Sequence, residues 1–130
     1  MANNWDASIK LLSPVDLSTN FTVDTIKPGA SFDVQANVEI GSQIFQFATG
    51  YKLRIWVRNV STFTLVAAKT IAGSLTGSPT PYNAVLTVNI PPTWTASPGD
   101  VLDVLASYEM DAVSQSDYSM ATSGQFVVVA

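Results

Sequence analysis

The chain has 130 residues, contains no histidine and no cysteine, and only 12% of its residues are charged. Histidine and cysteine carry out much of the acid–base, nucleophilic and metal-binding chemistry near neutral pH, so their absence argues against an enzyme and against a cofactor. Six basic residues against ten acidic ones give a net charge of −4. This balance argues against nucleic-acid binding, which needs clustered lysine and arginine.

A chain of this length suits one domain, which we place over residues 1–130. The first twelve residues lack a basic segment followed by a long apolar run, so we expect no signal peptide. No apolar stretch approaches the roughly 20 residues that a membrane span needs. The neutral, hydrogen-bonding composition favours an extracellular or cell-surface module, although the lack of cysteine is compatible with any compartment.

Short runs of alternating apolar and polar residues, separated by Pro, Gly, Ser and Asn, predict β-strands along the chain. In chain order these are Ser8–Leu12, Phe21–Val23, Phe32–Ile40, Tyr51–Val60, Thr62–Ala72, Ala84–Ile90, Leu102–Tyr108 and Gln125–Ala130. Pro14 is expected to end the first strand, at a sheet edge, and the polar residues 111–123 are expected to form a long loop. No segment has a sustained helical period.

This pattern predicts an all-β fold, an antiparallel β-sandwich of seven to nine strands. Its core is expected to contain the apolar residues that share one phase of each alternation: Phe32, Val34, Ala36, Val38, Leu53, Ile55, Val57, Leu86, Val88, Leu102, Val104 and Ala106.

Two Pro-Gly turns open strands of similar pattern, KPGASFDVQANVEI and SPGDVLDVLASYEM. These segments resemble the openings of strands B and F in bacterial immunoglobulin-like and fibronectin-III-like modules. The Cys…Trp…Cys pattern of antibody domains is absent, and Trp56 is out of phase with the apolar face of its strand. The resemblance implies an immunoglobulin-like sandwich with a role in adhesion or assembly, and it transfers no site residues.

We therefore expect a non-catalytic binding, adhesion or assembly module that acts through its loops and strand faces. The alternative is a carbohydrate-binding module that uses exposed aromatic side chains.

One candidate contact surface is a basic and aromatic face of the strand predicted over Tyr51–Val60. It consists of Lys52, Arg54, Trp56 and Arg58. As a site, it would meet an acidic protein partner or a sugar carboxylate. As structure, its basic residues would instead pair with Asp103 and Glu109 on a neighbouring strand.

Other aromatic residues give two further candidates. Phe45 and Phe47, between two glycines, either form an exposed contact or cap the core. Trp5, Trp94 and Tyr82 either stack on sugar rings or pack against the sandwich.

Two acidic groups have weak site patterns. Asp111, Ser114, Ser116 and Asp117 offer oxygen ligands in one segment, but two carboxylates are few for calcium, and a solvated loop explains them. Asp100 and Asp103 straddle a strand start, which is a poor arrangement for a glycosidase pair.

The C-terminal strand leads us to expect a homo-oligomer, most simply a dimer. Its residues Phe126, Val127, Val128 and Val129 are apolar on both faces, and no charged residue follows Asp117. Such a strand is either buried centrally within one subunit or covered by a second one, and we predict one of its faces at the contact, either Val127 and Val129 or Phe126 and Val128.

Overall fold

The computed structural model describes residues 5–130, and over this range the chain forms nine strands and one short helix. The elements are β1 (Ala7–Asp16), β2 (Thr25–Ile26), β3 (Phe32–Ile40), α1 (Ser42–Phe45), β4 (Ala48–Asn59), β5 (Thr64–Ser74), β6 (Tyr82–Ile90), β7 (Val101–Ala112), β8 (Ser116–Thr122) and β9 (Phe126–Val128). The described part of the chain contains no helix long and apolar enough to cross a membrane.

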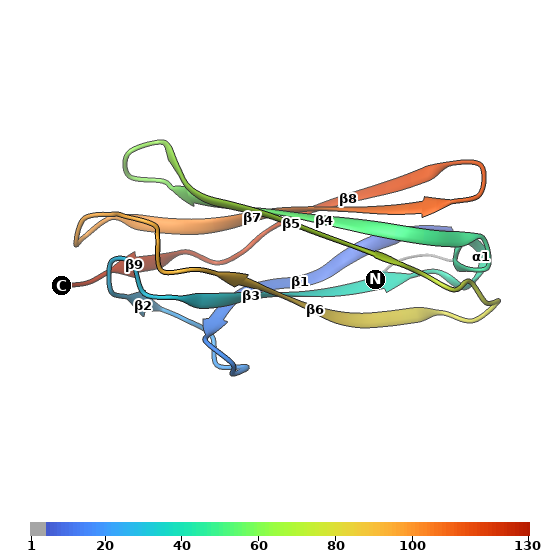
Figure 1. Ribbon diagram of the computed structural model, residues 1–130, viewed down its shortest axis with the longest axis horizontal. Coiled ribbons are helices and arrows are strands. Elements are labelled where there is room, and N and C mark those ends of the chain that lie inside the picture. Colours follow the sequence, from blue (N-terminus) through green and yellow to red (C-terminus); the bar gives the residue numbers. More distant parts are fainter. Residues whose placement is uncertain (1–4) are drawn as a thin grey trace.

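The strands form two sheets that lie against each other (Figure 1). The smaller sheet has the order β1-β3-β6, and the larger has the order β2-β9-β7-β4-β5, with β8 also paired to β7. The prediction of an all-β sandwich is therefore confirmed. The larger sheet is not wholly antiparallel as predicted, because the two residues of β2 pair in parallel with β9 after the chain crosses between the sheets.

The core lies between the sheets and contains the predicted residues. All of them are buried except Leu86, which is partly exposed because β6 is an edge strand of the smaller sheet. Phe32 packs edge-on against Phe126, with ring centroids 5.8 Å apart. The opposite side of the core also holds Tyr108, which stacks on Tyr51.

Two sequence-based expectations about strand ends were wrong. Pro14 does not end β1, because β1 is an edge strand, where a missing N–H is tolerated, and the Pro14 carbonyl accepts a 3.0 Å hydrogen bond from the Val23 amide. Residues 111–123 are not a long loop, because the chain turns tightly after β7 and returns as β8. The polar residues of β8 concealed its alternation.

The inward polar residues of β8 cover the free edge of β1. Asp117 Oδ2 accepts a hydrogen bond from the Ala7 amide at 2.7 Å, and Ser119 Oγ accepts one from the Ile9 amide at 3.1 Å. Unpaired amides at a sheet edge invite pairing with another chain, and side-chain oxygens remove that opportunity here.

We predict that Asp117→Ala combined with Ser119→Ala uncovers this edge. Amide hydrogen exchange at Ala7 and Ile9 should accelerate, and the free energy of unfolding should fall by about 1–3 kcal/mol for the two lost hydrogen bonds. Exchange measured by NMR, with exposed Ser114→Ala as the control, tests this. Unchanged exchange at Ala7 and Ile9 would contradict the assigned role of β8.

Candidate functional site

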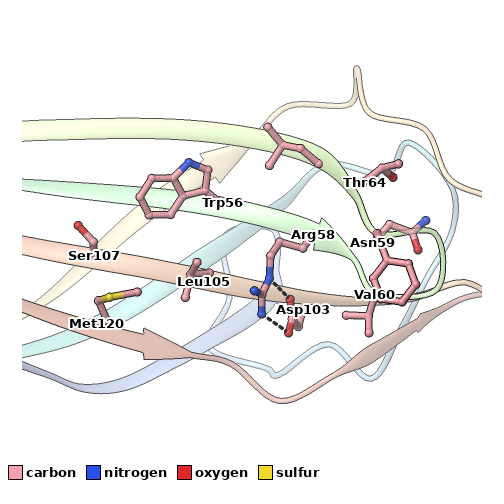
Figure 2. Close-up of a pocket in the computed structure, with 11 residues that line it drawn as sticks. Trp56, Arg58, Asn59, Val60, Thr64, Asp103, Leu105, Ser107 and Met120 are labelled. Atoms are coloured by element: carbon pink, nitrogen blue, oxygen red, sulfur yellow. Dashed lines mark hydrogen bonds and ion pairs between the residues drawn. The ribbon is translucent and has the colours of Figure 1, made fainter.

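The outer face of the larger sheet is hollowed into a groove of about 760 Å³ across β5, β4, β7 and β8 (Figure 2). We call this surface the groove. Its lining includes Trp56, Phe63, Leu65, Leu105 and Met120. The hollow forms beside Trp56 because small side chains surround the indole: Ala68 lies opposite it on β5, and Ser107 is two residues along β7 from its partner Leu105.

An ion pair forms part of the groove lining. Arg58 Nε and Nη2 each donate a 2.8 Å hydrogen bond to the carboxylate of Asp103 on the adjacent strand. The Asp103 side chain is 7% exposed and that of Arg58 is 43% exposed, so solvent reaches the guanidinium but scarcely the carboxylate. The hydrogen bonds to Asp103 raise the pKa of Arg58. The groove is thus lined by a neutral, fixed pair among apolar side chains.

The predicted basic face is therefore real, but its charge is largely compensated. Lys52, Arg54, Trp56 and Arg58 do share the outer face of β4, opposite the outward residues of β7. Besides the Arg58 pair, Arg54 Nη1 contacts Glu109 Oε1 at 3.1 Å. The structural interpretation, cross-strand pairing with Asp103 and Glu109, is confirmed, and Trp56 is left as a half-buried groove residue.

Phe63, in the β4–β5 turn, is the most exposed large apolar residue of the groove. Its side chain is 92% exposed, and its φ is +58°. A bulky residue in this left-handed region is strained by about 1–2 kcal/mol, and such strain concentrates at functional positions. Neither burial nor backbone preference accounts for a phenylalanine at this position.

A network of hydrogen bonds holds the strained turn in place. The buried Asn59 accepts hydrogen bonds from the amides of Ser61 and Thr62 at 3.0 and 3.1 Å. The Asn59 amide group donates a 2.8 Å hydrogen bond to Asp100, which belongs to the β6–β7 connection. Ser61 Oγ in turn accepts a 3.0 Å hydrogen bond from the Val101 amide. Two turns are thereby joined, and the position of Phe63 is fixed before any partner arrives.

Two predicted contact residues are buried and cannot meet a partner directly. Trp94 is 4% exposed, lies edge-on to Phe32 and donates a 2.8 Å hydrogen bond to the Ala30 carbonyl. Phe45 is 5% exposed and stacks on Tyr82, with 4.6 Å between the ring centroids. The contact predictions for Trp94 and Phe45 were wrong, because both side chains close the apolar interior.

The remaining aromatic candidates do not line the groove. Tyr82 is half-buried by its stacking on Phe45, whereas Phe47 and Trp5 are exposed. The structure therefore does not gather the proposed sugar-stacking residues at one place: Trp56 lines the groove, while Tyr82 begins β6 of the other sheet.

The acidic groups of the sequence have structural partners. Ser116 Oγ donates a 2.7 Å hydrogen bond to Asp111, which is the main cause that lowers the pKa of Asp111, while Asp117 faces β1. Asp100 binds Asn59, and Asp103 binds Arg58. Within residues 5–130, no three or more carboxylates gather into a group that could hold a metal ion.

The C-terminal strand is covered by its own chain. β9 lies between β2 and β7, and Phe126 and Val128 are each 1% exposed in the core. The prediction that these two residues form a contact between subunits was wrong, because the first alternative, central burial, applies. Val127 faces outward at 38% exposure, and Val129 is partly buried.

Sequence reasoning missed most of the groove. Phe63, Leu65, Leu105 and Met120 were not singled out, although a phenylalanine in a Ser-Thr-Phe-Thr turn is an unusual choice for a solvated turn. Tyr118 and Met120 alternate with Asp117 and Ser119, and that period of two could have revealed β8.

We predict that Phe63→Gly stabilises the isolated protein, because glycine adopts positive φ without strain. The free energy of unfolding should rise by about 0.5–1 kcal/mol, measured by urea denaturation. Thr62→Gly, in the same turn but without positive φ, should instead lower it. A loss of stability in Phe63→Gly equal to that in Thr62→Gly would show that the turn is not strained.

We call the hydrogen bonds of Asn59 and Ser61 that join the two turns the clamp. The contribution of the clamp to stability should depend on pH through Asp100. The Ser97 amide and then Asn59 hold the pKa of Asp100 below its ordinary value of 3.8. A carboxylate with a lowered folded-state pKa stabilises the fold above its unfolded pKa, and this contribution is lost as pH falls through the folded pKa.

Asp100→Asn should therefore be less stable than the wild type at pH 7, and the difference should shrink below about pH 4. Urea denaturation between pH 7 and pH 2.5 measures both proteins, with exposed Asp6→Asn as the control. A difference that stays constant over this range would mean that the charge of Asp100 does not stabilise the clamp.

Comparison with known proteins gives only remote similarities. No known family profile matches the sequence, and no curated protein matches it. The major subunit of Escherichia coli aggregative adherence fimbriae type I is 12% identical with a TM-score of 0.45, covering 95% of both chains.

The DNA-bound alkylpurine DNA glycosylase AlkC of Pseudomonas fluorescens is 17% identical with a TM-score of 0.48; the match covers 97% of this chain and 31% of that one. The β-glucuronidase of Bifidobacterium dentium is 17% identical with a TM-score of 0.44, and the match covers 95% of this chain and 18% of that one. The chain thus spans less than a third of both enzymes. TM-scores below 0.5 are too low for any of these similarities to bear on function.

Proposed function

We propose that this protein is a non-catalytic binding module that receives an apolar segment of a protein partner in the groove. The observation that carries this proposal is Phe63: a fully solvated aromatic ring, held in a strained conformation by a dedicated hydrogen-bond network, beside an apolar hollow. Exposed apolar patches beside polar residues are typical of protein contact sites, and central aromatic residues contribute most of the binding energy there.

We also propose that the sandwich is immunoglobulin-like. The order of the smaller sheet corresponds to strands A, B and E, and the order of the larger sheet corresponds to A′, G, F, C and C′, with β8 and β9 sharing the place of G. The groove then lies on the C′-C-F-G face. We propose that an adhesion or assembly role would act through this sheet face and the β4–β5 hairpin.

Carbohydrate binding is the less supported function. Of the predicted sugar-stacking residues, Trp94 is buried and Tyr82 is partly covered, and none of Trp5, Trp94 and Tyr82 lines the groove. The ion pair of Arg58 with Asp103 also occupies polar groups that a sugar would need.

A peptide selection tests the proposed function. We expect peptides selected from a phage-displayed library on the wild-type protein to be rich in apolar residues. Their affinity should fall at least about 30-fold for Leu65→Glu, because a carboxylate in the groove must be desolvated when the peptide binds. Titration with fluorescently labelled peptides measures the affinity, and Val85→Glu, at a residue of similar exposure on the smaller sheet, should leave it unchanged.

Peptides that bind Leu65→Glu as well as the wild type, or a selection without binders, would contradict the proposal. Glycan-array binding that disappears in Trp56→Ala would support the carbohydrate-binding alternative in its place.

A further inference from the structure

The smaller sheet ends at a strand edge that carries no protection against pairing with another chain. β6 is the last strand in the order β1-β3-β6, and no strand within residues 5–130 pairs with its outer side (Figure 1). About half of the peptide N–H and C=O groups of an edge strand point away from its sheet, so a row of donors and acceptors faces outward along β6. Another extended strand is the partner that satisfies such a row completely.

Two other long edge strands have features that oppose such pairing. On β5, Val66 has no partner on β4 and forms a bulge, while Lys69 lies opposite the buried Ile55 and therefore belongs to the inner face. Bulges and inward charges both obstruct the addition of a strand. β1 has a bulge at Lys10, and side chains of β8 bind two of its amides.

β6 has none of these features. Its sequence, YNAVLTVNI, contains no charged residue, no proline and no glycine. Its nine residues pair with β3 in an unbroken register, so no bulge turns the edge away. Leu86, in the middle of the strand, is left partly exposed at the border of the core. β6 is therefore a regular, uncharged edge with an incompletely covered apolar side chain, which is the arrangement that recruits another strand.

The side chains of β6 are complementary to those of a second, antiparallel copy of the same strand. With Leu86 opposite the partner's Leu86, all nine residues of the strand find an opposite residue. On the outer face, Asn83 then lies opposite the partner's Asn89, and Val85 lies opposite the partner's Thr87. On the inner face the opposed residues are Tyr82 with Ile90 and Ala84 with Val88. Amide meets amide and no like charges meet, so the strand suits its own copy.

From this match we propose that the protein forms a symmetric dimer by antiparallel pairing of β6 with β6 of a second copy. The pairing joins the two smaller sheets into one continuous sheet. The twofold axis of such a pair is perpendicular to the sheet, so both larger sheets lie on the same side of it and the two grooves face the same way. A partner with repeated apolar segments would then bind with avidity. This last consequence rests on the proposed function, whereas the dimer does not.

Charged residues introduced on the outer face of β6 test the contact. Val85→Lys combined with Thr87→Lys sets lysine opposite lysine in the dimer, and Val85→Glu combined with Thr87→Glu sets glutamate opposite glutamate. In sedimentation velocity the wild type should form a dimer of the 13.9 kDa chain at about 1 mM, because a contact between two strands is small and weak. Each double variant should associate at least about 10-fold more weakly.

An equal mixture of the two double variants gives the decisive result. It should recover the dimer, because lysine then meets glutamate at both positions. Thr70→Glu combined with Ala72→Glu, at exposed outer-face positions of β5, is the matched control and should dimerise like the wild type. Circular dichroism verifies that every variant is folded.

Cross-linking through a single introduced cysteine tests the register. The chain contains no cysteine, so one introduced thiol reports on one position. A short bifunctional thiol reagent should cross-link Leu86→Cys to its own copy, because Leu86 lies at the twofold axis. Asn83→Cys should not cross-link, since the two copies of this residue are six positions apart along the strands, or about 20 Å. The opposite pattern would overturn the proposed pairing.

A wild type that stays monomeric at about 1 mM overturns the inference, and so does a dimer that both double variants retain. A mixture of folded double variants that stays monomeric overturns it as well. Weaker association of the β5 control, with the β6 variants unaffected, would place the contact at the edge of β5 instead. Peptides selected on the groove should bind the β6 variants as tightly as the wild type, so failure of the dimer leaves the proposed function standing.

Discussion

The pairing of β4 with β7 is the interaction on which the rest of the structure depends. Each strand has 12 residues, and they lie side by side within the larger sheet. Their inward residues, such as Leu53, Ile55 and Val104, form the centre of the core. Because side chains alternate with a period of two, a shift of one residue would bury Arg54 and Arg58. The register that fills the core therefore also sets the outer face.

The same register explains why the outer face is apolar yet nearly uncharged. Arg58 meets Asp103 directly opposite, and Arg54 lies within reach of Glu109, so most of the charge on β4 is compensated by β7. Neutralised ion pairs repel neither an acidic nor a basic partner. What distinguishes the face is then the shape between Trp56 and Leu105, where the neighbouring side chains are small.

The sequence predicted the features that come from local alternation. Val34 was placed correctly in the core because the polar residues Asp33 and Gln35 bracket it, and Trp56 was placed correctly outside the core because it is out of phase with the apolar residues of its strand. The site was less predictable, because it depends on contacts between segments that are far apart in the sequence. In the sequence, Trp94 lies in a Pro-rich loop, which suggests a surface position. In the structure its ring packs in the core against Phe32, a residue far from it in the sequence. Phe63 becomes conspicuous only through its conformation, which Asn59 and Asp100 impose from two separate turns.

The edges of the two sheets differ in how they are covered. β8 covers β1 with side-chain hydrogen bonds and β2 covers β9 with backbone pairing, so two edges are closed by the chain itself. The outward edge of β5 is left unpaired, next to the turn that carries Phe63. A chain with few charges has little electrostatic protection against random association. The outer edge of β6 is open as well, so what distinguishes the β5 edge is the strained, pre-ordered turn beside it.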